Sequence, residues 1–174
     1  MPELIPILKR DEIAIKVAAM AKAISRDYKG RRLVLIGVLK GAFIFLSDLA
    51  RHLELDDVKI DFLRAASYGE GTRSSENIHL IKDIDTDIRD KDVLIVEDIL
   101  DTGLTMAFLI EHLKAHSPKS IRTCAFIDKP ERRKIPIEAD YVGHRVKEGF
   151  LVGYGLDFAE DYRNLPDIYH LKID

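Results

Sequence analysis

Short unbroken runs of apolar residues recur along the chain. They lie within Leu33–Val38, Val93–Asp98 and Ile121–Asp128, and Val58–Ala65 is a further run rich in apolar residues. Apolar residues without polar alternation are typical of strands that are buried on both faces. These segments are therefore predicted to be strands of one buried sheet.

Between these runs, apolar residues recur at helical spacing. In Asp11–Lys29 they lie three or four positions apart, which predicts an amphipathic helix. Asp11 is the predicted N-cap and Gly30 the predicted C-terminal stop. The helical pattern returns at Ala42–Leu53 and at Thr105–His116, each after a predicted strand.

The alternation of strand and helix predicts an α/β fold with a mostly parallel central sheet flanked by helices. We expect a single domain that spans residues 1–174. Ala66–Asn77 is a polar loop rich in Gly and Ser, and Ile78–Asp83 is predicted to return from it as a strand. Glu138–Asp174 mixes short apolar stretches with Gly and Tyr, and its pattern predicts no definite element.

The composition is that of a globular protein. Apolar residues make up 47% of the chain and charged residues 33%, which excludes a disordered or fibrous class. The formal net charge is −3. Since proteins that bind nucleic acid non-specifically are more often basic, we predict no nucleic-acid partner.

The sequence shows no pattern for secretion or membrane insertion. The N-terminal stretch MPELIPILKR lacks a basic region followed by a long apolar one. The most apolar window, Gly37–Ala50, contains Lys40 and Asp48 and is shorter than the roughly 20 residues that a spanning helix needs. Cys124, the one cysteine, lies in an apolar run and is expected to be a buried thiol. We therefore predict a cytoplasmic protein with no membrane partner.

Candidate chemistry is concentrated in VLIVEDILDTGLT, Val93–Thr105. A carboxylate in a dry interior costs several kcal/mol unless it is paired. Glu97 and Asp98 are therefore expected at the carboxyl end of their strand, where ligands of open α/β sheets bind. Carboxylates at this point suit the hydroxyls of a ribose or a divalent cation.

The following DTGLT leads into the predicted helix. A helix start offers free N–H groups and a partial positive charge, which together bind phosphate. Gly103 lets the backbone approach a ligand closely, and Thr102 and Thr105 can add hydroxyl donors. The alternative is that Asp101 or Thr102 only caps the helix. We favour phosphate binding because the motif follows a buried strand that ends in two acids.

VLIVEDILDTGLT resembles the phosphoribosyl-diphosphate signature of the type I phosphoribosyltransferases. The resemblance implies that Glu97 and Asp98 face the ribose hydroxyls and that Thr102–Thr105 surrounds the 5′-phosphate. The binding residues that it implies in this stretch are Glu97, Asp98, Ile99, Thr102, Gly103, Leu104 and Thr105.

Other segments resemble the hypoxanthine-guanine phosphoribosyltransferases within that family. GVLKGAFIF is similar to their pyrophosphate loop, which implies binding by Leu39, Lys40 and Gly41, often with a cis peptide between the first two. SYG, with Ser67 and Tyr68, is similar to the start of their mobile lid, here Ser67–Asn77.

The resemblance continues to Pro166. DKPERR contains Lys129, which is implied to meet the purine 6-oxo group. FLVGYGLDFAEDYRNLP is similar to the purine segment of the family. In it, Phe150 is implied to stack on the base and Leu151 to bind its edge, with Asp157 and Arg163 at the metal–pyrophosphate end.

The resemblance implies a type I phosphoribosyltransferase fold with a small hood from the terminal segments. It implies transfer of a phosphoribosyl group to hypoxanthine or guanine, giving IMP or GMP and pyrophosphate. Asp101 and Lys129 are the implied catalytic residues, with Asp101 taking the proton from N7. Mg²⁺ is the implied cofactor, held by Glu97, Asp98 and Asp157. The implied partners are small-molecule substrates and further copies of the chain, in a homodimer or homotetramer.

Two alternative functions are compatible with the same fold. One is a regulator that senses phosphoribosyl diphosphate and binds nucleic acid. The presence of both Asp101 and Lys129 argues against it, because a sensor needs neither proton transfer nor a base clamp. The other is a phosphoribosyltransferase for another base, such as xanthine or a pyrimidine.

Two further patterns have a simpler interpretation. His112 and His116 are four residues apart, a metal-ligand spacing, but HExxH is absent and no third ligand is evident, so we favour a solvated helix face. Lys129–Lys134 (KPERRK) is basic enough to touch RNA. We favour a solvated loop with one functional lysine.

Overall fold

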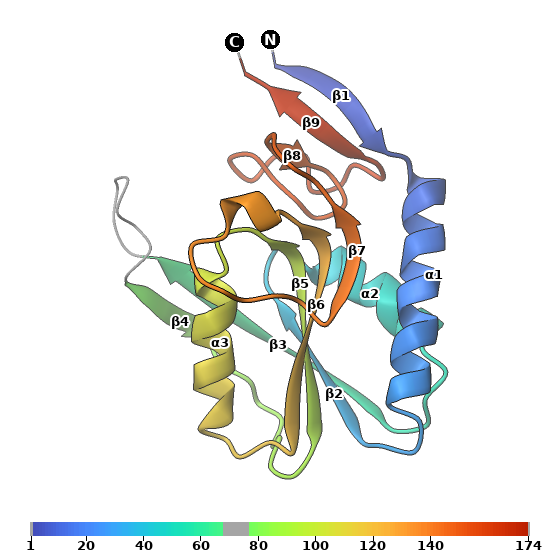
Figure 1. Cartoon of the computed structure of the whole chain (residues 1–174), viewed down its shortest axis with the longest axis vertical. Helices are drawn as coiled ribbons and strands as arrows, with labels where there is room; N and C mark the ends of the chain where they lie inside the picture. Colours follow the sequence, from blue (N-terminus) through green and yellow to red (C-terminus); the bar gives the residue numbers. More distant parts are fainter. Residues whose placement is uncertain (1, 68–76, 174) are drawn as a thin grey trace.

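The computed structural model describes residues 2–67 and 77–173. Its centre is a six-stranded sheet in the order β4-β3-β2-β5-β6-β7, antiparallel only between β4 and β3 (Figure 1). The strands are β2 (Leu33–Val38), β3 (Val58–Ser67), β4 (Ile78–Lys82), β5 (Asp92–Leu100), β6 (Ser120–Asp128) and β7 (Tyr141–Arg145). The predicted α/β class, its mostly parallel sheet and the strands from Leu33 to Asp128 are confirmed.

Helices cover both faces of this sheet (Figure 1). α1 (Arg10–Asp27) and α2 (Phe43–His52) lie on one face, and α3 (Leu104–Lys114) lies on the other. Successive strand residues point to opposite faces. Leu33 and Leu35 of β2 accordingly pack with α1 and α2, whereas Val34 and Ile36 pack with α3. Within the described ranges, no helix is long and apolar enough to cross a membrane.

The ends of the chain form a second, antiparallel sheet in the order β1-β9-β8. Its strands are β1 (Glu3–Leu8), β8 (Leu151–Val152) and β9 (Ile168–Lys172). The two termini lie side by side in this sheet, above the carboxyl ends of the central strands (Figure 1). The hood expected from the terminal segments is confirmed. The strand β1, however, was not expected from its sequence pattern.

The first helix begins earlier than predicted. Its N-cap is Lys9, whose backbone N–H donates to Glu12 Oε2 at 2.9 Å, so the prediction that Asp11 is the cap is wrong. The Glu three residues after the cap thus accepts the N–H of the cap residue itself, which is one half of a capping box. The helix ends at Asp27, ahead of Gly30, which has a positive φ of 75°.

The connections of the central strands reverse between β2 and β5. The chain passes from β2 through α2 to β3 on one side, and from β5 through α3 to β6 on the other. Ligands of open α/β sheets bind at such a point, outside the carboxyl ends of the strands. The segment after β2 and the end of β5 therefore face the same crevice.

The hood touches the crevice at one glycine. Gly155 has a φ of 98°, and a Cβ placed on it would lie 2.1 Å from the backbone oxygen of Gly41. Backbone packs directly on backbone here, so any side chain at position 155 would separate the hood from the segment after β2.

A Gly155→Ala variant is expected to lose stability for two reasons. Positive φ disfavours alanine by about 1–2 kcal/mol, and crowding against Gly41 adds about 1–3 kcal/mol. Gly30→Ala is the matched control, because Gly30 has a φ of 75° and no atom within 4 Å of its Cβ position. Urea unfolding of both variants measures the difference, and equal losses would contradict the tight contact.

Candidate active site

The crevice between β2 and β5 is narrow because glycine faces an acid. A Cβ at Gly41 would lie 1.9 Å from Asp98 Oδ2, so only glycine fits beside this carboxylate. The preceding peptide, Leu39–Lys40, is cis, as the resemblance predicted. The segment Leu39–Gly41 thus presents its backbone to the end of β5.

Glu97 and Asp98 lie within β5, which continues to Leu100. Glu97 is buried, and burial together with the adjacent Asp98 carboxylate raises its pKa well above the usual range. Burial also raises the pKa of Asp98, while the Ile99 N–H, which donates to Asp98 Oδ1 at 2.8 Å, favours its charged form. The positive charge of Arg163 acts in the same direction. The fold therefore holds both acids where burial disfavours their charged form, as expected of a ligand site.

The segment after β5 forms a cradle at the N-terminus of α3. Gly103 is the N-cap with a φ of 86°, and no side-chain bond of the usual N-cap kind closes the helix within the described part of the chain. Thr102 Oγ1 accepts only a long 3.4 Å bond from the Leu104 N–H. Since the first N–H groups of a helix have no partner inside it, they remain available to an anion.

Asp101 does not cap this helix. Its Oδ1 accepts a hydrogen bond from Arg132 Nε at 2.7 Å, in an ion pair that solvent still reaches. Arg132 belongs to the short 3₁₀ helix η1 (Pro130–Arg132), which follows β6. The interpretation that Asp101 is only a helix cap is therefore wrong.

Lys129 directly follows β6 and lines the cavity beside the end of β5. It is buried, and its ammonium donates to the Gly149 backbone oxygen. Burial lowers the pKa of Lys129. A buried ammonium with one backbone acceptor retains further donor capacity for a ligand carbonyl.

A cavity of about 600 Å³ lies between the end of β5 and the hood. Phe150 lies at the edge of this cavity and is 47% exposed. Its ring packs edge-to-face against that of Phe158, with 5.6 Å between the ring centroids. Leu151, in β8, is buried beside it. The predicted site residues that line this cavity are Asp98, Ile99, Asp101, Lys129, Phe150, Leu151 and Asp157.

A smaller hollow of about 280 Å³ adjoins the cavity. It shares Asp98, Ile99 and Asp101 with the larger one. The predicted site residues that line it are Glu97, Asp98, Ile99, Asp101, Thr102, Gly103 and Thr105. The two hollows thus adjoin, with Asp98 and Asp101 at their boundary.

Charged side chains of the hood close the far side of the crevice. Arg163 donates to the Gly155 backbone oxygen at 2.7 Å and pairs with Asp157 at 3.1 Å. Lys40 Nζ lies 2.6 Å from Glu160 Oε2. Arg163 Nε is buried and has no hydrogen-bond partner among the described residues. The hood loop and the segment after β2 are therefore linked by charge as well as by packing.

Of the expected lid, Ser67–Asn77, the structure describes Ser67 and Asn77. Ser67, at the end of β3, lines a third hollow of about 560 Å³ with Thr102, Leu104 and Thr105. Tyr68 and the rest of the expected lid up to Glu76 lie outside the described residues.

Sequence analysis did not identify Arg133 as a residue that supports the site. Arg133 is largely buried and donates to the backbone oxygens of Leu100 and Asp101 at 3.0 and 2.7 Å, so it fixes the loop at the start of the cradle. The interpretation of Lys129–Lys134 as a solvated loop with one functional lysine is wrong for Arg133, which is largely buried. The only signal for Arg133 is its place in a basic run directly after a buried strand.

Comparison with known proteins agrees with this geometry. Residues 6–159 match the family model of the phosphoribosyl transferase domain. A hypoxanthine-guanine phosphoribosyltransferase of Aquifex aeolicus is 48% identical over 95% of this chain and 93% of its own length. A hypoxanthine phosphoribosyltransferase of Salmonella typhimurium is 42% identical over 89% of this chain and 88% of its own.

A solved structure matches equally well. A crystal structure of a hypoxanthine-guanine phosphoribosyltransferase from Bacillus anthracis superposes with a TM-score of 0.92 at 43% identity, covering 99% of this chain and all of that one. The family model, the relatives and the fold agree with the resemblance carried by Val93–Thr105. The chain belongs to the phosphoribosyl transferase family.

Proposed function

We propose that this protein transfers the 5-phosphoribosyl group of phosphoribosyl diphosphate to hypoxanthine or guanine. The products are IMP or GMP and pyrophosphate. The observation that carries the proposal is that two hollows adjoin, one beside a helix N-terminus and one beside Lys129 and Phe150. A phosphate site and a base site meet at two acids, where a ribose would join them.

The smaller hollow suits the sugar phosphate. Free N–H groups at the start of α3 and the hydroxyls of Thr102 and Thr105 bind the 5′-phosphate. Glu97 and Asp98 accept hydrogen bonds from the ribose hydroxyls. The negative charge that the pair carries also stabilises the positive charge that develops on the ribose as the carbon–oxygen bond to pyrophosphate breaks.

The pyrophosphate leaves toward the hood. Lys40 and Arg163 supply positive charge there, and the backbone of Leu39 and Gly41 lies beside them. The partners of these cations in the structure are Asp157 and Glu160. A bound diphosphate would replace these carboxylates as the partner of the Arg163 guanidinium and the Lys40 ammonium.

The larger hollow suits a 6-oxopurine. Its volume of about 600 Å³ is within the usual range for small-molecule sites. The exposed ring of Phe150 offers a stacking surface, and Leu151 offers backbone atoms to the base edge. The Lys129 ammonium donates to the 6-oxo group and disfavours adenine, whose 6-amino group is also a donor.

The carboxylates near the diphosphate suit Mg²⁺. Asp98 and Asp157 line the same cavity, but Glu97, Asp98 and Asp157 do not form a compact three-ligand cluster in the described chain. Mg²⁺ is usually bound by one or two carboxylates together with substrate phosphates, which fits this set. When bound, the ion neutralises charge on the departing pyrophosphate.

Asp101 is the proposed general base. Its carboxylate lines both hollows, so it lies where base and sugar meet. The ion pair with Arg132 holds the carboxylate at the opening of the base cavity. It accepts the proton from N7 as N9 bonds to the anomeric carbon.

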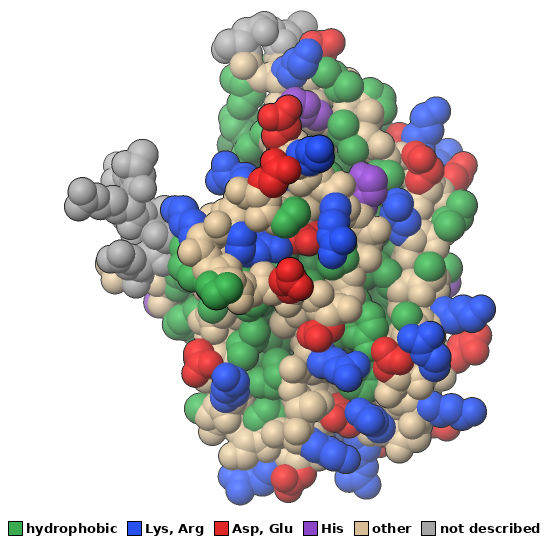
Figure 2. Space-filling view, viewed as in Figure 1, with side chains coloured by type: hydrophobic (Ala, Val, Ile, Leu, Met, Phe, Trp, Pro, Cys, Tyr) green, Lys and Arg blue, Asp and Glu red, His purple; other side chains and the backbone are tan. Residues whose placement is uncertain are grey.

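The surface supports small-molecule substrates as the partners. Basic and acidic side chains are interspersed over the face shown in Figure 2, without a broad basic area. The buried Cys124 suits a reducing cytoplasm. A homodimer or homotetramer is part of the proposal, and Ile15, 71% exposed, is an apolar side chain that such contacts would cover.

Pyrophosphate release from phosphoribosyl diphosphate with a panel of bases tests the proposal. Hypoxanthine and guanine are expected to support turnover with Mg²⁺, whereas adenine and uracil are not. Addition of a chelator should abolish release and Mg²⁺ should restore it. Preference for xanthine, adenine or uracil, or full activity in chelator, would contradict the proposal.

Lys129→Ala is expected to impair base binding selectively. Loss of a hydrogen bond from a charged donor corresponds to about 1.5–3 kcal/mol, which is about a 10- to 150-fold rise in KM for hypoxanthine. KM for phosphoribosyl diphosphate should change little. Lys91→Ala, which removes a surface lysine far from the cavity, is the control. An unchanged KM for the base would show that Lys129 does not contact it.

Asp101→Asn is expected to lower kcat by about 10²–10⁴-fold, because the amide is a far poorer base. The exposed ion pair with Arg132 contributes at most about 1 kcal/mol, so the melting temperature should hardly change. Arg132→Gln removes the same ion pair but keeps the carboxylate, and kcat should fall much less. Near-normal kcat in Asp101→Asn would exclude the proton-transfer role.

A further inference from the structure

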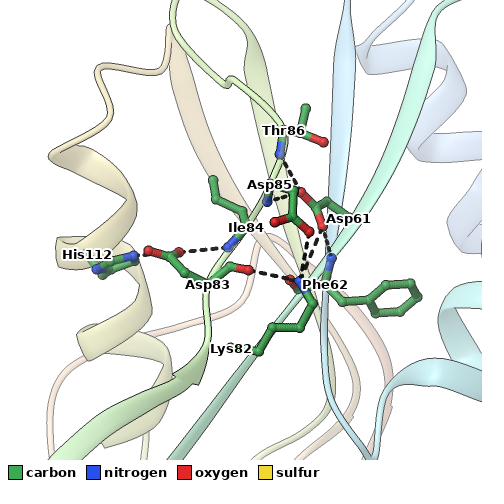
Figure 3. A network of polar contacts seen from close by, with 8 residues as sticks. All are labelled: Asp61, Phe62, Lys82, Asp83, Ile84, Asp85, Thr86 and His112. Carbon is green, nitrogen blue, oxygen red and sulfur yellow. Dashed lines mark hydrogen bonds and ion pairs between the residues drawn. The ribbon is translucent and has the colours of Figure 1, made fainter.

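A second cluster of polar side chains lies at the far end of α3. His112 Nε2 is 2.9 Å from Asp83 Oδ1, and the rings of His112 and His116 are 5.3 Å apart. Asp83 directly follows β4, and its carboxylate points at His112 across the gap between strand and helix (Figure 3). The active site uses the opposite end of this helix, so the cluster serves no step of the proposed reaction.

The three side chains meet the geometric requirement for a metal site. Each offers one ligand atom, and these atoms all lie within 4.8 Å of one another. Ligand atoms of a tetrahedral zinc ion at bond lengths of 2.0–2.1 Å are about 3.4 Å apart. Small side-chain rotations would bring this set to that spacing. The third ligand that the histidine spacing alone did not reveal comes from Asp83, 29 residues before His112.

The surroundings hold the ligands in place. Asp83 Oδ1 also accepts the Ile84 N–H at 2.8 Å, which fixes the carboxylate. The Phe108 ring lies nearly parallel to that of His112, at 11° and 6.5 Å. Two of the three ligands are therefore positioned before any ion binds, which lowers the entropy that binding must overcome.

The electrostatics favour a cation at this point. His112 and His116 lie at the C-terminal end of α3, where the helix dipole is negative. The ammonium of Lys82, the residue before Asp83, is 3.3 Å from Asp85 Oδ2 and 3.9 Å from Asp61 Oδ1, so its charge is already balanced (Figure 3). Asp83 and His116 are exposed, so an ion can enter from solvent.

We propose that Asp83, His112 and His116 form a binding site for a divalent transition-metal ion of the zinc type. Two imidazoles and one carboxylate are a ligand set suited to Zn²⁺, and a water completes the tetrahedron. The bound ion joins the end of α3 to the segment after β4, two elements that start or end near the active site. It is independent of the Mg²⁺ that the proposed reaction uses.

Zinc binding to the whole, chelator-treated protein tests this site by competition with a chromophoric chelator. The wild type is expected to bind one Zn²⁺ at the cluster. Asp83→Asn, His112→Gln and His116→Gln should each weaken that affinity by at least about tenfold, since loss of an outer-shell partner alone already costs 10- to 100-fold. His52→Gln is the matched control, because it removes an exposed histidine near the end of α2.

Two further readouts separate this site from adventitious binding. Co²⁺ should give the visible absorption of a four-coordinate ion in the wild type and in His52→Gln, but not in His116→Gln. Zn²⁺ should raise the melting temperature of the wild type and of His52→Gln, but not that of His116→Gln. The inference is overturned by equal zinc affinity in the wild type and His116→Gln, or by an equal loss in His52→Gln.

Discussion

The site depends on one close contact, the packing of the Asp98 carboxylate against the backbone of Gly41. The distance of 1.9 Å from Asp98 Oδ2 to the Cβ position of residue 41 leaves room for hydrogen alone. This contact brings the segment after β2 to the acids of β5, at the point where the strand connections diverge. The acids are partly or fully buried, so the fold holds them against their desolvation. The Ile99 N–H and the charge of Arg163 compensate only part of this cost.

The remaining parts of the site are arranged around that contact. Gly155 of the hood packs on the backbone oxygen of Gly41, so the loop after β2 lies between the Asp98 carboxylate and the backbone of the hood. Arg163 then bonds to the Gly155 oxygen and to Asp157, which fixes the hood loop over the crevice. On the other side, Gly103 starts α3 without a capping side chain and leaves its N–H groups free. The proposed base, sugar and phosphate sites thus share one short stretch at the end of β5.

Local patterns predicted strands β2 to β6 and the three α-helices, because burial on both faces and helical spacing show in residues that are close in sequence. They did not predict β7, which lies in the segment Glu138–Asp174 with no clear pattern. They did not predict β1, because its partner β9 lies at the other end of the chain, with Glu3 opposite Lys172. The acids of β5 and the glycine of the cradle could be predicted, since an acid pair at the end of a buried strand is costly unless a ligand uses it. The buried role of Arg133 and the meeting of Asp83 with His112 could not, because contacts between distant segments leave no periodic signal. Tyr68 and the lid stay predictions.

The central claim is that the fold keeps Glu97 buried beside Asp98, where its charged form is disfavoured, because ligand binding requires a carboxyl group there. Its raised pKa means that the folded protein retains a proton that the unfolded chain releases near pH 4.3. The stability of the wild type should therefore fall as pH rises from about 4.3 to the folded pKa, whereas Glu97→Gln has no such loss. The free energy of unfolding of both proteins, measured by urea between acid and neutral pH, tests this directly. The account predicts that the variant gains stability over the wild type as pH rises, and loses activity. A variant that is less stable at neutral pH, or a difference independent of pH, would contradict it.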